Sequence, residues 1–222
     1  MRRLIPCFVI SFALLLPAGA NAVDRTVSVR ATVEREVPND AAEVRFAVSK
    51  ERAGRAAALR IVALRVRAVL AAAEAAPGVG PGDVTTGSIS VRRVERGKRP
   101  VFKASEGVTV ITHQPEAAGE LVSAGVAAGA TSTRGPRFFA SDREAAYEAA
   151  LVEALLQAKQ KAGMLASAAG AMLGPAITIA ESGGATPVPA PQKDLAEDAP
   201  APPVEPGASS VRATVEATFA LL

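Results

Sequence analysis

The chain has 222 residues, a formal net charge of +3, one cysteine, one histidine and no tryptophan. A net charge this near zero gives no reason to expect a nucleic-acid partner, and a single cysteine excludes a disulfide within the chain. Because aromatic residues make up only 4% of the chain, the core must be built from Val, Leu, Ile and Ala, which suits helices packed closely on a sheet.

The first 22 residues have the pattern of a secretory signal peptide. A short basic head precedes an apolar run, Leu4–Leu16, that is too short to span a bilayer comfortably. The small residues of ANA, which ends at Ala22, fit a signal peptidase site, so we expect export with cleavage after Ala22. A retained membrane anchor is the alternative. Cleavage removes Cys7 and leaves 23 basic against 22 acidic residues, so the mature chain has no thiol and no lipid-anchor cysteine.

Two alternating stretches follow the leader. Val27–Val37 and Glu43–Ser49 each place apolar side chains at every second position, which is the period of a half-buried strand. Between them, the sequence VPND contains Pro38 and has the composition of a turn. We therefore predict that these two strands pair as a hairpin.

Helices and strands fill the middle of the chain. Arg55–Ala76 carries apolar residues at helical spacing, and Pro77 and Gly78 end that helix. Two strands follow around the turn ERGK, and then an alanine-rich helix and a short strand. Their predicted ranges are Ser88–Val94, Val101–Thr112, Pro115–Gly129 and Thr133–Ala140.

The sequence FFASDREAAYEAA, residues 138–150, gathers a serine, a tyrosine and several carboxylates, as an active site or the start of a helix would. Ser141 and Glu144 have the spacing of a capping box, in which each side chain accepts from the backbone N–H of the other residue. Asp142 adds negative charge at the positive end of the helix. Alanine then recurs every four residues over residues 146–162. We therefore interpret the cluster as helix initiation.

The last part of the chain places a proline-rich stretch between two predicted strands. Ala176–Glu181 has the composition of a strand, and Val211–Leu221 alternates with period two. Residues 182–209 hold seven prolines and few large apolar residues, a composition that does not order itself. Because the final strand should return to the sheet, we predict one domain over residues 23–222, with a disordered loop at about residues 183–209.

No pattern for catalysis, cofactor binding or metal binding stands out. His113 is the only histidine, so a histidine metal site would lack its usual second ligand, and no nucleophile-elbow motif accompanies it. We expect an exposed or capping His113 with no evident partner. The sequence GVGPGD at residues 78–83 follows a helix and lacks the Lys-Ser/Thr ending of a phosphate loop, so it is better explained as a connecting loop. We therefore expect no catalytic, cofactor-binding or metal-binding residues.

One basic cluster surrounds the predicted turn ERGK. It consists of Arg92, Arg93, Arg96, Lys98, Arg99 and Lys103. Two interpretations account for it: contact with an anionic surface, such as lipid headgroups or a partner's acidic patch, and a solvated tip whose charges prevent edge-to-edge pairing. We favour the second, because charged edges commonly have that role. These six residues are the candidate contact site.

Four segments of the chain, in their order, carry a family resemblance. They are VSVRATVEREVPNDAAEV, GDVTTGSISV, the long stretch from AGVAAGATSTRG through FFASDREAAYEAALVEALLQAKQKAG to AAGAMLG, and VRATVEATFALL. Together they resemble the SIMPL-domain family, which includes bacterial periplasmic immunogenic proteins, over nearly all of the mature chain. Two departures stand out. Ala31 and Val33 replace a Gly-x-Gly that members often have, and Phe102 stands near one of several tyrosine positions that are otherwise not matched.

The resemblance implies an α+β fold, with an antiparallel or mixed sheet, strand-helix-strand units and two to three helices packed on it. It also implies a periplasmic, non-enzymatic role in the cell envelope, with tolerance of envelope or oxidative stress and self-assembly into homo-oligomers. The partners expected are a second copy, an envelope protein or, through the basic cluster, an anionic membrane surface. The alternative class is a periplasmic ligand-binding protein or hydrolase, which a cleft with convergent polar groups would favour.

Overall fold

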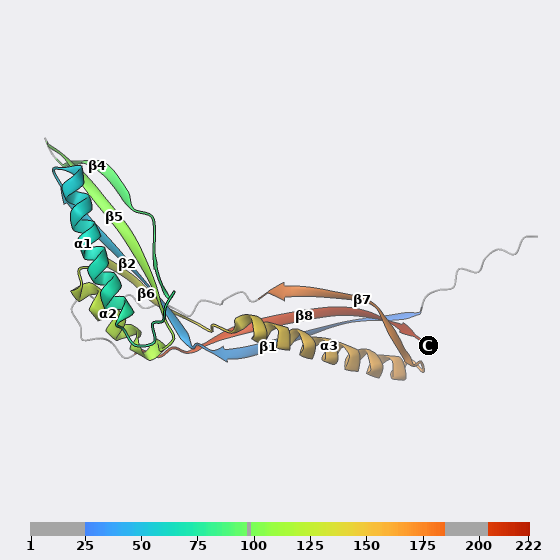
Figure 1. Cartoon of the computed structure of the whole chain (residues 1–222). Helices are drawn as coiled ribbons and strands as arrows, with labels where there is room; N and C mark the ends of the chain where they lie inside the picture. The colour runs from blue at the N-terminus through green and yellow to red at the C-terminus, as the bar shows by residue number, and fades with distance from the viewer. Residues whose placement is uncertain (1–24, 97–98, 185–203) are drawn as a thin grey trace, which may run out of the picture.

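The computed structural model describes residues 25–96, 99–184 and 204–222, and the predicted signal peptide lies outside these residues. The described chain forms two layers, each a sheet with helices on one face, and the layers lie end to end in an elongated molecule (Figure 1). All paired strands are antiparallel. The predicted α+β class is confirmed, but the strands form two sheets instead of the single predicted sheet.

The three-stranded layer consists of β1 (Thr26–Pro38), β8 (Ala208–Leu221) and β7 (Leu173–Gly184), in the order β1-β8-β7, with helix α3 (Arg143–Ala168) on one face. Buried side chains alternate along β1 and β8, as their period-two patterns predicted. In α3, the alanines at positions 150, 154, 158, 162 and 166 are all buried. Their small side chains let the helix lie close to the sheet, where Val29, Val215 and Phe219 complete the core.

The five-stranded layer holds the other strands and helices. The strands are β2 (Ala41–Arg52), β3 (Val84–Thr86), β4 (Ser90–Arg96), β5 (Arg99–Thr112) and β6 (Ser132–Phe139). Their order is β3-β5-β2-β6, with β4 also paired to β5. Helices α1 (Arg55–Glu74) and α2 (Ala118–Ala127), the latter preceded by the 3-10 turn η1 (Pro115–Ala117), cover one face. Phe46, Val62 and Val108 lie in the core between them.

The five-stranded layer is a continuous insertion, residues 41–139, between β1 and α3. The chain crosses between the layers first at Asn39–Asp40 and again at residues 140–142. Ala41 and Phe139, at the two ends of the insertion, are cross-strand partners, so the two crossings lie side by side. The main packing partners of every helix and strand lie in its own layer. The crossings therefore control how the layers are joined.

The predicted hairpin of the first two strands is wrong. β1 pairs with β8, whereas β2 pairs with β5 and β6 in the other layer. Asn39, between them, does not reverse the chain but is held by the start of β8. Its side-chain amide donates to the Pro206 carbonyl, and its side-chain carbonyl accepts from the Ser209 hydroxyl. Alternation predicted both strands correctly, but it says nothing about which strand is the partner.

The strands extend into both ends of the predicted proline-rich loop. β7 continues to Gly184, which pairs with Arg212, and β8 begins at Ala208, which pairs with Pro38. The middle of that loop, residues 185–203, lies outside the described residues. The single domain predicted for residues 23–222 stays a prediction, for which one cooperative unfolding transition would be the evidence. None of the described helices is long and apolar enough to cross a membrane.

Candidate functional site

The predicted basic cluster lies on the β4–β5 hairpin, at the end of the five-stranded layer farthest from the three-stranded layer (Figure 1). The strand register pairs Arg92 with Lys103 and Arg96 with Arg99. Cross-strand partners at alternate positions share one face of a hairpin. Four of the six predicted side chains therefore lie on the same face.

The other two predicted residues lie elsewhere. Arg93 is opposite Phe102, on the second face of the hairpin, and its Nε is 3.0 Å from Oε1 of Glu95. Lys98, in the turn, lies outside the described residues. The cluster is thus one basic face and one separate ion pair.

A carboxylate from the neighbouring strand meets the basic face. Arg96 donates from Nε and Nη2 to the two carboxylate oxygens of Glu51 in β2, over 3.2 and 3.1 Å. The hydrogen bond from Arg96 lowers the pKa of Glu51, and the charges of Arg96, Lys103 and Arg92 lower it further, against a desolvation effect that raises it. Sequence reasoning missed Glu51, which lies 45 residues before Arg96 and is brought there only by the pairing of β2 with β5.

Three cations of the cluster, Arg92, Arg99 and Lys103, have no ion pair within the described part of the chain. Exposed charges interact weakly and are screened by salt. The hairpin face can therefore attract phosphate or carboxylate groups only by the sum of several weak contacts.

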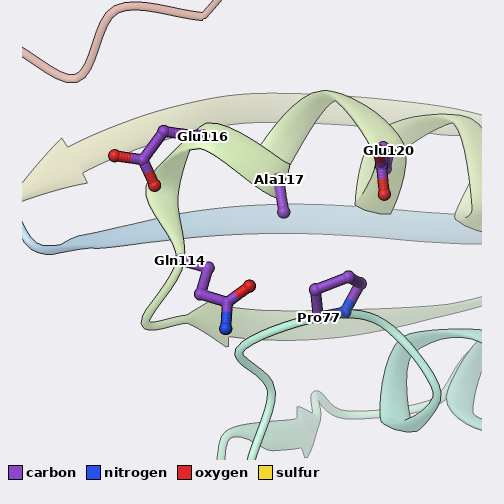
Figure 2. A pocket seen from close by; sticks show the side chains of 5 residues that line it. All are labelled: Pro77, Gln114, Glu116, Ala117 and Glu120. Atoms are coloured by element: carbon purple, nitrogen blue, oxygen red, sulfur yellow. The ribbon is translucent and has the colours of Figure 1, made fainter.

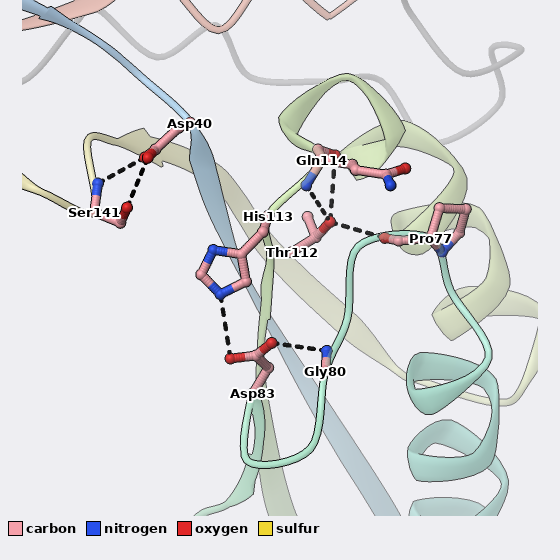
Figure 3. Close-up of polar contacts among 8 residues, drawn as sticks. All are labelled: Asp40, Pro77, Gly80, Asp83, Thr112, His113, Gln114 and Ser141. Atoms are coloured by element: carbon pink, nitrogen blue, oxygen red, sulfur yellow. Dashed lines mark hydrogen bonds and ion pairs between the residues drawn. The ribbon is translucent and has the colours of Figure 1, made fainter.

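A second polar cluster lies where the chain crosses between the layers (Figure 3). Asp40, at the first crossing, accepts hydrogen bonds from the N–H and the hydroxyl of Ser141, at the second crossing, each over 2.6 Å. The hydroxyl bond and then the backbone bond lower the pKa of Asp40, and the charge of His113 adds a minor lowering. These bonds tie the two crossings together.

The predicted capping box at the start of α3 is wrong. The N-cap residue is Asp142, and no side chain caps the helix there. The N–H of Ser141, which Glu144 would accept in a capping box, donates to Asp40 instead, and the Ser141 hydroxyl also donates to Asp40. The Asp40 carboxylate, from far along the chain, takes the place of the local Glu144 carboxylate, and its charge strengthens both hydrogen bonds.

His113 lies at the end of β5 in the same region, and its side chain is exposed, as predicted. The expectation that it has no partner is wrong, because its Nε2 is 3.4 Å from Oδ1 of Asp83. The other oxygen of Asp83 accepts from the Gly80 N–H over 2.8 Å. The backbone N–H of His113 donates to the carbonyl of Gly78. These contacts fasten the loop after α1 to the end of β5.

A shallow hollow of about 390 Å³ lies between this loop and the start of α2 (Figure 2). Its lining consists of Pro77, Gln114, Glu116, Ala117 and Glu120. Both carboxylates are exposed to solvent. Ligand sites usually enclose their ligand in a largely apolar cavity with a few converging polar groups, which this open acidic hollow does not resemble.

A comparison with known protein families shows to which family the chain belongs. The model of the SIMPL family, described as a protein of unknown function (DUF541), matches residues 27–219. The chain belongs to the SIMPL family. The match runs from β1 to β8, so the SIMPL sequence pattern includes the inserted layer as well as the layer that surrounds it. No curated protein matches the chain.

Three polar side chains of this SIMPL protein, those of Ser141, His113 and Tyr147, make contacts that hold the fold. The hydroxyl of Ser141 donates to Asp40, and the ring of His113 faces Asp83. The hydroxyl of Tyr147, in α3, donates to Glu181 of β7 over 2.7 Å, which raises the pKa of Tyr147. Within the described residues, no group of three or more His, Cys, Asp or Glu side chains could hold a metal ion.

Proposed function

We propose that this SIMPL protein is exported to the periplasm and acts in the cell envelope by association with other surfaces, its own included, rather than by catalysis. The proposal rests on the position of the exposed apolar side chains of the protein. Ile177 and Ile179 of β7, and Val152, Leu156 and Met164 of α3, are each more than half exposed. All five belong to the three-stranded layer, whereas on the described helices and strands of the five-stranded layer only Leu64 and Val126 are large apolar residues exposed to this extent. Apolar surface that gathers on one part of a protein marks an interaction site.

The polar contacts support a role without catalysis. Ser141 donates its hydroxyl hydrogen to Asp40, whose pKa is lowered, and a carboxylate of low pKa is a poor general base. The alternative is a periplasmic hydrolase or ligand-binding protein. For a hydrolase, Ser141 and His113 would be the candidate catalytic residues. A panel of ester, peptide and glycoside substrates tests it: hydrolysis by the purified protein that is lost in Ser141→Ala would replace our proposal.

The signal-peptide pattern at residues 1–22 supports export. We expect protein recovered from the periplasmic fraction to begin at Val23, as N-terminal sequencing would show. Protein that begins at Met1, or that remains in the cytoplasmic fraction, would contradict this part of the proposal.

The family resemblance supports a part in tolerance of envelope or oxidative stress. We expect a strain that lacks the protein to survive peroxide and envelope-disrupting detergent less well than a strain complemented with the whole chain. Equal survival of the two strains under both treatments would contradict this role.

Sedimentation of the purified mature protein tests directly whether the protein associates with itself. We expect the weight-average mass to rise above that of the monomer as the protein concentration rises. A monomer over the whole accessible range of concentration would contradict self-association.

A further inference from the structure

We propose that two copies of this protein associate through β7, which pairs edge to edge and antiparallel with β7 of the second copy. The inference rests on the proposed function, because it names the surface through which self-association occurs. It begins from a comparison of the strands that form the edges of the two sheets.

The other edge strands carry features that prevent pairing with another chain. β1 carries Arg30, Glu34, Arg35 and Glu36; β4 carries Arg92, Arg93, Glu95 and Arg96; and β6 carries Arg134, Pro136 and Arg137. β3 has only three residues. Charges, prolines and short length are the usual protection of a sheet edge.

The β7 edge has fewer charges than the others, although it carries Pro175 and its register against β8 shifts between Leu173 and Thr178. It is 12 residues long, and Glu181 is its only charged residue. All residues from Pro175 to Ser182 are exposed, and within the described part of the chain β7 pairs with β8 alone. An exposed, long edge strand with a single charge presents unpaired backbone groups, and another strand can satisfy them.

The helix leaves part of the apolar face of β7 uncovered. Ile179 pairs with Ala217, which is buried against α3, so Ile179 points to the helix side of the sheet. Ile177 lies at an irregularity of the strand, where the register of β7 against β8 shifts between Ala176 and Thr178, and it is an exposed apolar residue next to this side. Each is 55% exposed, because α3 packs chiefly over β1 and β8. Leu151 and Leu155 of α3 are partly buried and pack against the core of this layer.

A second copy of β7 complements this edge. If the two-fold axis passes through Thr178, each Ile177 lies opposite Ile179 of the other copy, and Glu181 lies opposite Pro175 rather than another carboxylate. A two-fold axis at Ile179 would instead place Ile177 opposite Glu181. Pairing through Thr178 keeps both α3 helices on one face, so that the two Ile179 side chains are covered between them. The contact is isologous and closes as a dimer.

Lysine substitutions test the edge. The double variant Ile177→Lys/Ile179→Lys places charges on exposed positions, so we expect an unchanged circular dichroism spectrum and a dimer dissociation constant raised by at least about tenfold. Leu64→Lys is the matched control, because Leu64 is also an exposed apolar residue, 66% exposed, but lies on α1 in the other layer. We expect this control to associate as the wild type does.

Disulfide trapping tests the register. In a Cys7→Ser background, Thr178→Cys brings two thiols opposite each other across the two-fold axis, so mild oxidation should cross-link the dimer. Ser28→Cys, at an exposed position of β1 on the other edge of the same sheet, is the control and should remain uncross-linked.

The outcomes separate this inference from the proposed function. A wild type that stays monomeric overturns both. Association that survives Ile177→Lys/Ile179→Lys, or a Thr178→Cys protein that cross-links no better than Ser28→Cys, overturns the β7 pairing and leaves self-association through another surface. Slow amide exchange along β7 in dilute monomer would mean that the protein's own chain already covers this edge, and would also overturn the inference.

Discussion

Asp40 and Ser141 lie 101 residues apart in the sequence, yet they are joined by two hydrogen bonds of 2.6 Å at the place where the chain passes between the layers. Since helices and strands pack mainly within their own layers, few other contacts hold the layers together. Asn39, next to Asp40, is held by the start of β8. The two neighbouring residues therefore fix both crossings.

We expect Asp40→Ala to destabilise the protein by about 1 kcal/mol, because it removes the acceptor of two bonds whose donors remain accessible to water. Ser141→Ala should cost less, since the backbone bond survives. Urea unfolding measures both, with Glu74→Ala on the exposed side of α1 as the control. An Asp40→Ala protein as stable as this control would contradict the role of the crossing.

The same contact predicts a pH dependence. The pKa of Asp40 is lower in the folded protein than its usual 3.8. The stabilisation by Asp40 is therefore complete above pH 3.8 and is lost as the pH falls through the lower folded value. Urea unfolding at a series of pH values should show that the wild type and Asp40→Asn differ in stability above pH 3.8 and converge below it. A difference that is constant across this range would exclude the ionised Asp40 as the cause.

Gly125, in α2, lies so close to the ring of Phe46 that a β-carbon on it would overlap the ring atoms. Because Phe46 is buried in the core and cannot move aside freely, we expect Gly125→Ala to cost about 1–3 kcal/mol in stability. Adding Phe46→Leu should recover part of that loss. Gly163→Ala in α3, where the nearest atom would be 4.0 Å away, is the control and should be neutral or stabilising in thermal unfolding.

Truncation after Ser209 should unfold the three-stranded layer. β8 is its central strand, and Val211, Val215 and Phe219 are buried there. Each contributes about 1.5–3 kcal/mol by burial, a large part of the roughly 5–15 kcal/mol that stabilises a domain. By contrast, a single cut within residues 187–206 should leave both pieces associated. Release of the C-terminal piece after such a cut, seen by native chromatography, would contradict the pairing of β8 with β1 and β7.

The basic hairpin should act mainly to keep its edge unpaired. We expect replacement of Arg92, Arg99 and Lys103 by Thr to increase light scattering of the concentrated protein, because the β4–β5 tip loses its charges. Binding to anionic vesicles at low salt should change little. Loss of vesicle binding in this variant without increased scattering would favour the anionic-surface interpretation instead.

The regular elements could be predicted well because their periods are local properties of the sequence. The alanine spacing of α3 and the alternation of β8 each appear in the structure at nearly the predicted positions. Sequence patterning predicts no strand at β3, because Val84–Thr86 is too short to show a period. The false hairpin had another cause: a turn-like VPND suggested reversal, whereas Asn39 finds its partners at the start of β8.

The candidate site was predictable in composition but not in its contacts. The basic residues of the hairpin are close in sequence, so their clustering could be seen directly. Glu51 and Asp83 could not be matched to Arg96 and His113, because strand pairing and a loop contact bring them together. Ser141 was assigned to the nearest plausible carboxylate, Glu144, while the structure uses Asp40 from the other crossing.

The insertion of residues 41–139 begins and ends at Ala41 and Phe139, which face each other across two neighbouring strands. A module whose ends are adjacent can be gained, lost or exchanged without separating the termini of its host, because the host needs only a short bridge to close the gap. Evolution can therefore alter the inserted layer and the surrounding layer at different rates. Chimaeras that exchange residues 41–139 between relatives should keep the host's three-stranded sheet intact.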